Sequence, residues 1–316
     1  MNKFTSIKDV SDVGSLLSLA QSVKQNPFGH QALGKQKTLG LLFFNPSLRT
    51  RLSTQKAAMN LGMNVMVMNL NSDGWKIELE DGTVMDQGTQ EHIKEAAGVI
   101  SQYCDIIGIR TFASLEDREA DYNEEIMQKF IANATVPVVS LESATLHPLQ
   151  SLADLLTIHE HKSKPKPKVV LTWAPHPRAL PQAVANSFAE WMREAEVEFV
   201  IANPKSFDLS TRFTEGVNVF HDQEEAFKGA DFIYAKNWSS FHDYGKIGEA
   251  HADWLVTAEK MALTNEGKFM HCLPVRRNVV VSDAVIEAES SLVLQQANNR
   301  TYAAQAVLHT MLSHEK

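Results

Sequence analysis

Several features that would direct the interpretation of this chain are scarce or missing. Its 316 residues contain only two cysteines, Cys104 and Cys272, which are too few for a disulfide framework and do not have metal-ligand spacing. No apolar run approaches the roughly 18 residues needed to cross a bilayer, and the N-terminus MNKFTSIKDV lacks the apolar core of a signal peptide. We therefore expect a soluble, cytoplasmic protein without a metal centre.

The chain also lacks an excess of positive charge. Its formal net charge is −8 and its pI is about 5.8, which argues against a nucleic-acid scaffold because phosphate backbones select for clustered Lys and Arg. A small anionic substrate needs only a local basic pocket. Neither of the glycine-rich nucleotide motifs GxGxxG and GxxxxGK[ST] occurs in the sequence.

What is present is an alternation of strand and helix patterns in both halves of the chain. Strands are predicted at 38–44, 64–70, 105–110, 137–141, 168–173, 197–202, 231–235 and 268–272, and helices at 8–25, from Pro46, and at 121–133, 147–161, 180–194, 222–228, 255–262, 283–289 and 298–313. This order predicts the α/β class, with two doubly wound parallel-sheet domains joined by interdomain helices. The break KSKPKPK at 162–168 lies near the junction, and we predict domains at 1–150 and 151–316, with the last helix packing back on the first domain.

The stretch from Phe43 to Arg51 is predicted to be a strand-to-helix turn. Backbone N–H groups of the first helical turn have no intrahelical partners, and here they lie beside two hydroxyls and a guanidinium, in Ser47, Leu48, Arg49 and Thr50. Such a turn can bind a phosphate. An ordinary capped helix with exposed arginines is the alternative that the stretch alone leaves open.

Other unusual polar residues follow predicted strands: Arg110, Glu142, the segment His147–Gln150, the segment Pro175–Arg178, Lys236 and the segment His271–Asn278. Their recurrence in both domains predicts a cleft lined from both sides. Singly, each has a structural explanation as an ion-pair, turn or solvated residue, and Cys272 is more often a buried apolar residue than a nucleophile. The polar stretch 71–90 is long for a connection in a compact domain, and Trp75 within it is either pinned to its own domain or inserted into a neighbour.

The order Ser47-Leu48-Arg49-Thr50, Arg110, His147-Pro148-Leu149-Gln150 and His271-Cys272-Leu273-Pro274 resembles the aspartate and ornithine carbamoyltransferase family over most of the chain. The resemblance implies two α/β domains and a trimer with active sites between subunits. It also implies transfer of a carbamoyl group from carbamoyl phosphate to an amine, without a metal or an organic cofactor.

Departures from the family pattern narrow the acceptor. Aspartate carbamoyltransferases have a PLP-type turn where this chain has His271 to Pro274, and a lysine in the loop where this chain has Trp75. Ornithine carbamoyltransferases have an aspartate and a Ser-Met-Gly motif that bind a free α-amino acid, where this chain reads Ala235-Lys236-Asn237-Trp238-Ser239-Ser240. Lys236 suits the α-carboxylate of an ornithine whose α-nitrogen is acylated, so the chain resembles the N-acylornithine branch, which serves arginine biosynthesis.

The resemblance implies a role for each matching residue. Thr50, Arg110 and His147 match catalytic donors to the carbonyl oxygen. The carbamoyl phosphate-binding positions are Ser47, Leu48, Arg49, Thr50, Trp75, Arg110, His147, Gln150, Cys272, Leu273 and Arg300, and the acylornithine-binding positions are Glu142, His176, Lys236, Arg276 and Gln90. Trp75 and Gln90 are expected to reach the active site of a neighbouring subunit in a homotrimer.

The acyl group is the least determined feature. Relatives carry a carboxylate for acetyl or a proline for succinyl at the position matched by Gln90, which is neither. A neutral residue would not repel a second carboxylate, and Arg276 and Arg178 are candidate cations for it, so we favour N-succinyl-L-ornithine as the acceptor. The alternatives are the same reaction on N-acetyl-L-ornithine and, in a different class, a noncatalytic phosphate-metabolite binding protein.

Overall fold

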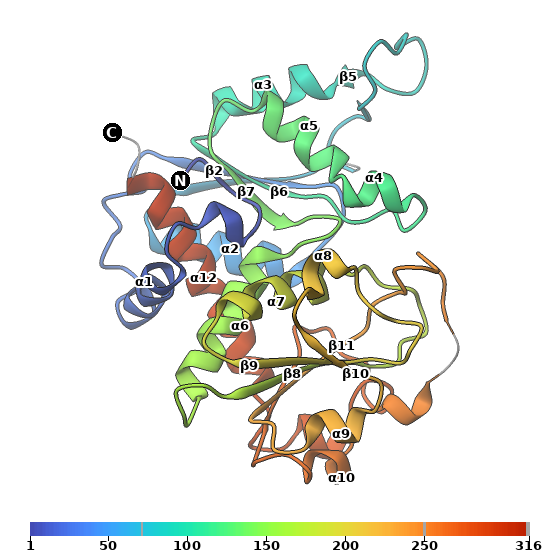
Figure 1. Ribbon diagram of the computed structural model, residues 1–316. Helices are drawn as coiled ribbons and strands as arrows, with labels where there is room; N and C mark the ends of the chain where they lie inside the picture. The colour runs from blue at the N-terminus through green and yellow to red at the C-terminus, as the bar shows by residue number, and fades with distance from the viewer. Residues whose placement is uncertain (71, 249–250, 314–316) are drawn as a thin grey trace. The chain divides into compact units, whose positions relative to one another are not determined.

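The computed structural model describes residues 1–70, 72–248 and 251–313 (Figure 1). Asn71, the first residue of the polar stretch predicted at 71–90, lies outside the described residues. The chain divides into two compact units. The first comprises Met1–Ser114, Glu119–Leu149 and the chain from Arg300 onward, and the second comprises Leu115–Arg118 and Gln150–Asn299.

The first unit is built on a five-stranded, fully parallel sheet. Its strands are, in spatial order, β1 (Lys3–Phe4), β7 (Val138–Glu142), β6 (Ile106–Arg110), β2 (Thr38–Phe43) and β3 (Asn64–Asn69). The helical elements are η1 (Ile7–Asp9), α1 (Val13–Gln25), α2 (Leu48–Asn60), α3 (Ile93–Tyr103), α4 (Arg118–Tyr122) and α5 (Glu125–Asn133). The apolar sides of α3 and α5 pack with the sheet in one core that includes Ile93, Ile107 and Phe130.

The second unit repeats this architecture. Its parallel sheet has the order β10 (Asn218–Phe220), β9 (Glu198–Ala202), β8 (Lys168–Trp173), β11 (Phe232–Lys236) and β12 (Lys268–Met270). The helical elements are α7 (Ala183–Glu194), α8 (Thr211–Thr214), α9 (Gln223–Phe227), η2 (Ala252–Trp254), α10 (Ala258–Met261) and α11 (Asp283–Ile286). Phe188 of α7 stacks on Tyr234 of β11 with ring centroids 4.4 Å apart, which fixes this helix on the sheet.

Two helices continue from one unit into the other. These are α6 (Pro148–His161) and α12 (Val293–Ser313), the latter with Arg300 as its first residue in the first unit. Within the second unit, α6 and α12 are joined by hydrogen bonds from Gln296 to Asp154 and from Asn299 to Thr157. Within the described part of the chain, none of the helices is long and apolar enough to span a membrane.

The predicted α/β class with two parallel sheets is confirmed, whereas several boundaries were wrong. The helix predicted from residue 8 begins at Val13, because the Asp12 side chain accepts from Ser15 N and caps it there. Pro46 does not belong to the first turn of α2, whose N-cap is Ser47. Helix α3 and strand β10 were missed, and the predicted helix 121–133 is split at Glu124 by a left-handed backbone conformation.

The polar stretch after β3 contains a small parallel ribbon of β4 (Ile77–Glu78) and β5 (Glu91–His92). Trp75 is 55% exposed, and its indole Nε1 donates to Glu91 Oε2 over 2.8 Å. Gln90 is exposed and its backbone N–H donates to Lys76 O, 3.0 Å away. The Trp75 side chain is therefore held by the Glu91 carboxylate and the Gln90 backbone by Lys76, and both side chains keep much of their surface exposed.

Candidate active site

The turn from β2 into α2 presents an anion-binding helix N-terminus. Ser47 is the N-cap in an extended conformation, and its hydroxyl makes no capping hydrogen bond to the helix. The N–H groups of the first turn have no intrahelical acceptors and lie at the positive end of the helix dipole. The Leu48 side chain is 69% exposed, so the backbone N–H is what this residue offers to a ligand.

Thr50 in the same turn is buried and orientated by Arg300 of α12. The Arg300 guanidinium Nη2 donates to Thr50 Oγ1 over 2.5 Å, and both side chains are almost fully buried. Because the hydroxyl oxygen accepts from Arg300, its own proton is directed elsewhere and can be donated to a ligand. This hydrogen bond joins residues from the beginning and the end of the chain within the first unit.

Arg110, the last residue of β6, is fixed by four hydrogen bonds. Its Nε and Nη2 donate to Glu142 Oε2 over 3.1 and 2.7 Å, and its Nη1 donates to the backbone carbonyls of Asn45 and Pro46, each 3.1 Å away. A guanidinium has five N–H groups, so one Nη2–H is left for a ligand. The contacts to residues 45 and 46 place Arg110 beside the turn that carries Ser47.

Asn45 is a positioning residue that was not singled out from the sequence. Its Oδ1 accepts from the backbone N–H of Phe112 over 2.9 Å, which ties the β2–α2 turn to the segment after β6. The signal was available, because an asparagine before proline at the end of a buried strand favours a side-chain-to-backbone hydrogen bond.

Glu142 and His147 are buried close together at the two ends of the loop between β7 and α6. Glu142 is the last residue of β7 rather than following it, and its Oε2 lies 3.9 Å from His147 Nε2. Burial acts to raise the pKa of Glu142, but the neighbouring His147, Arg110 and Arg300, together with the hydrogen bond from Arg110, outweigh burial and lower it. Glu142 therefore remains a carboxylate in the first unit, with Arg110 and His147.

The same surroundings keep His147 neutral. Burial lowers the pKa of His147 to about 3, Glu142 acts to raise it, and the charges of Arg300 and Arg110 act in the same direction as burial. In the described part of the chain its Nδ1 is buried without a hydrogen-bond partner. A neutral imidazole offers one N–H donor and one acceptor, so it can bind a carbonyl oxygen without transferring a proton.

In the second unit, a buried network links Gln150 of α6 to the segment after β12. Asp154 Oδ1 accepts from Gln150 Nε2 and from Gln296 Nε2, each over 2.7 Å, and Gln296 Oε1 accepts from the backbone N–H of His271 over 2.9 Å. Asp154 and Gln296 were missed in the sequence, although a carboxylate among the leucines of 149–156 is a recognisable signal.

The segment His271–Pro274 has an unusual backbone. The Leu273 N–H donates to His271 Nδ1 over 2.9 Å, and Leu273 has φ +53, a left-handed conformation that is uncommon for a leucine. Cys272 is partly buried, and Tyr234 lies next to it. Burial first, and then the neighbouring Asp154 and Cys272, raise the pKa of Tyr234 well above its usual range. The predicted residues Cys272 and Leu273 are thus held in a defined, strained turn.

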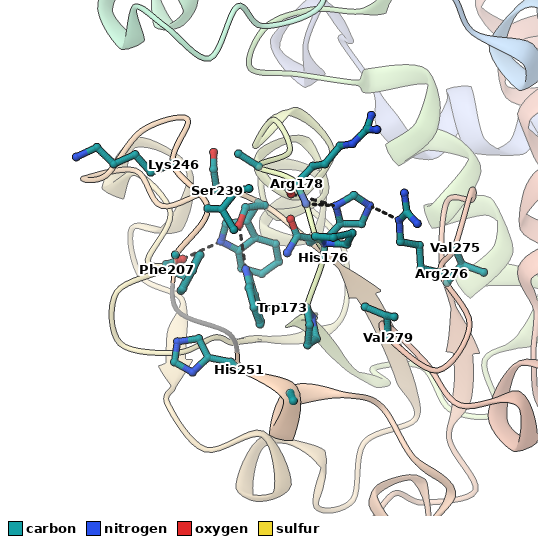
Figure 2. Close-up of a pocket in the computed structure, with 18 of the residues that line it drawn as sticks. Trp173, His176, Arg178, Phe207, Ser239, Lys246, His251, Val275, Arg276 and Val279 are labelled. Carbon is teal, nitrogen blue, oxygen red and sulfur yellow. Dashed lines mark hydrogen bonds between the residues drawn. The ribbon is translucent and has the colours of Figure 1, made fainter.

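Two of the five residues predicted to bind the acceptor, His176 and Arg276, line a cavity of about 710 Å³ in the second unit (Figure 2), whereas Glu142 and Gln90 belong to the first unit. His176 Nε2 accepts from Arg276 Nε over 3.1 Å, and His176 Nδ1 lies 3.0 Å from Arg178 O. A proton on Nδ1 satisfies both contacts, and burial lowers the pKa of His176, so the ring is neutral. Figure 2 shows the Arg178 and Arg276 side chains extending in the same direction on either side of His176.

Lys236 lies at the end of β11 beside this cavity. It is buried, its Nζ donates to Asn237 O over 2.9 Å, and its charge contributes to the lowered pKa of His176. The cationic lining residues are Arg178, Lys246, Arg276 and Arg277, and among the residues that the structure describes no Asp or Glu lines the cavity. Of these cations, Arg277 is paired with Asp283 and Glu287, and Lys246 with Asp243.

No group of three or more potential metal ligands occurs among the residues that the structure describes. Both units instead offer fixed hydrogen-bond donors, one around a helix N-terminus and the other around a basic cavity. These are features of an enzyme class that binds small anionic substrates in two parallel α/β units.

The chain belongs to the aspartate/ornithine carbamoyltransferase family. The family's carbamoyl-P binding domain matches residues 2–160 and its Asp/Orn binding domain matches residues 181–311. The N-succinylornithine carbamoyltransferase of Bacteroides fragilis is 52% identical over 314 residues, covering 99% of both chains. The N-acetylornithine carbamoyltransferase of Xanthomonas campestris is 35% identical over 327 residues, covering 97% of this chain and 96% of that one.

A solved structure is consistent with the same family and branch. The crystal structure of a mutant N-acetyl-L-ornithine transcarbamylase complexed with carbamyl phosphate and N-succinyl-L-norvaline superposes with a TM-score of 0.93 at 35% identity. The match covers 98% of this chain and 100% of that one. The chain is accordingly a carbamoyltransferase of the N-acylornithine branch, as its motifs predicted.

Proposed function

We propose that this enzyme transfers the carbamoyl group of carbamoyl phosphate to the δ-amine of N-succinyl-L-ornithine, giving N-succinyl-L-citrulline and phosphate in arginine biosynthesis. The main observation that supports this choice of acceptor is the cavity of the second unit, whose described lining residues include four cations and neither Asp nor Glu. N-succinyl-L-ornithine has two carboxylates, one more than its N-acetyl counterpart, and gains more from this lining. The 52% identity to enzymes named for the succinyl substrate supports the same choice.

In this proposal the first unit binds carbamoyl phosphate. The backbone N–H groups of the first turn of α2, the Ser47 hydroxyl and Arg49 bind the phosphate, and Arg110 adds its remaining N–H. Thr50, whose proton is directed away from Arg300, and neutral His147 donate to the carbonyl oxygen as negative charge develops on it. The proposal also assigns to carbamoyl phosphate Arg300 of the first unit and Gln150, Cys272 and Leu273 of the second.

The chemical step needs no side-chain base in this proposal. The neutral δ-amine attacks the carbonyl carbon, the bond from that carbon to the phosphate oxygen breaks, and the departing phosphate accepts the amine proton. Most of the acceleration then comes from orientation of the two substrates and from preorganised donors. His176, Lys236 and Arg276 hold the acceptor, and Glu142, which lies in the first unit beside Arg110, is also assigned to the acceptor.

Steady-state assays with N-succinyl-L-ornithine and N-acetyl-L-ornithine, side by side with carbamoyl phosphate, test the acceptor. We expect kcat/KM to favour the succinyl substrate by about 100-fold, the scale of a well-placed charged contact. A preference for the acetyl substrate would overturn the assignment of the acyl group while leaving carbamoyl transfer intact.

We also propose that the enzyme is a homotrimer, in which Trp75 and Gln90 serve a neighbouring active site. One face of the first unit supports self-association, because α2 contacts the edge strand β3 and both carry exposed apolar side chains, namely Leu48, Leu52, Met59, Met66 and Met68. Such a group is larger than isolated surface residues require. Sedimentation equilibrium should give a mass of three chains, and a monomer at micromolar concentration would contradict the proposal.

A further inference from the structure

A glutamate outside the proposed substrate-binding residues makes an unusual set of contacts in the first unit. Glu124 lies between α4 and α5, partly buried, and its carboxylate accepts four hydrogen bonds from one short segment. The donors are Ser143 Oγ at 2.7 Å, Ala144 N at 3.1 Å, Thr145 N at 2.8 Å and Thr145 Oγ1 at 2.5 Å. Both carboxylate oxygens are used, so the segment is bound in one conformation.

The bound segment connects two residues of the proposed site. Residues 143–146 join Glu142, at the end of β7, to His147, which precedes α6. The segment is also closed on itself, because Ser143 N donates to Leu146 O over 2.8 Å. Glu124 thus fixes a rigid four-residue turn from outside.

Local structure gives Glu124 no other reason for this arrangement. It occupies the N-cap position of α5, where an acidic side chain ordinarily accepts from the first helical turn, yet it makes no capping hydrogen bond. Its backbone has φ +54 and ψ +39, a left-handed conformation that costs a non-glycine residue free energy. The contacts to residues 143–145 explain both why Glu124 makes no capping hydrogen bond and why its backbone adopts a strained conformation.

Glu142 and His147, which flank the turn, differ in the other contacts that fix their positions. Glu142 belongs to the β7 ladder and accepts two hydrogen bonds from Arg110, so its position does not depend on the turn. His147 has no such support, because its Nδ1 is buried without a partner in the described part of the chain and its Nε2 is 3.9 Å from Glu142. The conformation of the turn therefore decides where the His147 ring lies.

We propose that Glu124 is a positioning residue for carbamoyl transfer, which holds the turn 143–146 so that the neutral His147 ring is correctly placed. The inference rests on the proposed function, in which His147 donates to the carbonyl oxygen of carbamoyl phosphate. A misplacement of about 1 Å at such a donor can cost about 100-fold in rate.

A double-mutant cycle between the two residues tests the inference. Glu124→Gln keeps the size of the side chain but places a donor NH2 group opposite the backbone N–H of Ala144 or, with the amide flipped, of Thr145, so the turn loses part of its support. With His147 present we expect kcat to fall by about tenfold; in the His147→Ala background the same change should lower kcat by less than about twofold. Equal losses in both backgrounds, or no loss with His147 present, would overturn the inference.

Two further variants keep the test decisive. Glu125→Gln changes the adjacent exposed carboxylate and should leave kcat unchanged, which controls for altered charge. Thr145→Val removes one hydroxyl donor and keeps Glu124, so it serves if Glu124→Gln fails to fold; its smaller loss of kcat should also disappear in the His147→Ala background. Wild-type protein without carbamoyl transfer would refute the proposed function, whereas an active wild type with an equally active Glu124→Gln variant refutes only this inference.

Discussion

The chemical role of a single side chain in this protein depends on which of its donors and acceptors are already used by other protein groups and which are left for a ligand. Thr50 is available as a donor because its oxygen accepts from Arg300. Arg110 has one N–H left for a ligand because Glu142 and two backbone carbonyls accept from its other four. The residue types were readable in the sequence, whereas this division of donors and acceptors depends on residues up to 250 positions apart.

At the residue scale, Lys236 provides a test of the acceptor side. Lys236→Ala removes a buried cation next to His176 and should raise the KM for the acylornithine by about 100-fold, because a lost charged contact costs a few kcal/mol. The KM for carbamoyl phosphate should change by less than about threefold. Steady-state kinetics with each substrate varied in turn measure both, and equal increases would refute the assigned role.

His147 should leave a signature in the pH dependence of stability. Its folded-state pKa of about 3 lies below the ordinary 6.5, so the unfolded chain binds more protons between these values and the free energy of unfolding falls as pH drops below about 6.5. His147→Gln removes this titration and should reduce the loss by about 1.4 kcal/mol per pH unit between pH 6 and 5. Urea unfolding at both pH values measures the slope, with the exposed His242→Gln as control; an unchanged slope would contradict the buried, neutral state.

At the scale of elements, α6 and α12 are joined by polar groups in a buried setting. Asp154 on α6 and Gln296 on α12 hold Gln150 and the His271 backbone in place through hydrogen bonds of 2.7 to 2.9 Å. Periodicity predicts the apolar sides of such helices, but it does not reveal that a carboxylate and an amide replace apolar contacts between them.

Two substitutions at Gln296 should distinguish the effect of losing its hydrogen bonds from the effect of adding a negative charge. Gln296→Met leaves Asp154 and the His271 N–H without this partner and should cost about 2–5 kcal/mol of unfolding free energy, to a similar extent at pH 5 and pH 8. Gln296→Glu places a second carboxylate beside Asp154, whose mutual repulsion raises the pKa of the pair, so its loss should be larger at pH 8 than at pH 5. Chemical denaturation at the two pH values distinguishes them, and identical pH dependence would argue against a buried network.

At the scale of the whole molecule, the ribbon of β4 and β5 packs against the core of the first unit through Ile77, whereas the Trp75 and Gln90 side chains beside it remain available to the proposed assembly. Trp75 contacts Glu91 of the same ribbon and remains half-exposed, and the Gln90 side chain is exposed. Neither side chain is used by the core of the first unit, which is consistent with a function outside it.

We expect Gln90 to determine how efficiently the enzyme uses an acceptor with a second carboxylate. Gln90→Glu adds a negative charge in the ribbon, which should lower kcat/KM for N-succinyl-L-ornithine by about tenfold through like-charge repulsion and change that for N-acetyl-L-ornithine by less than about threefold. Gln90→Asn, which keeps the amide, is the matched control. If both acceptors respond alike, Gln90 does not contact the acyl group.

The amino-acid sequence by itself determined the α/β class, the two parallel sheets and the family. Alternating strand and helix patterns are local properties, and motifs such as His147–Gln150 and His271–Pro274 keep their identity without any knowledge of packing. Local patterns failed where long-range contacts override propensity, as at the left-handed Glu124 and in the undetected α3 and β10.

Only the tertiary structure decided what each polar residue binds and in which protonation state. Burial makes His147 neutral, Arg300 directs the Thr50 proton, and Glu142 accepts hydrogen bonds from Arg110 within the first unit. Charge and hydrogen bonding depend on distance and burial in three dimensions, and neither can be read from the order of residues along a chain.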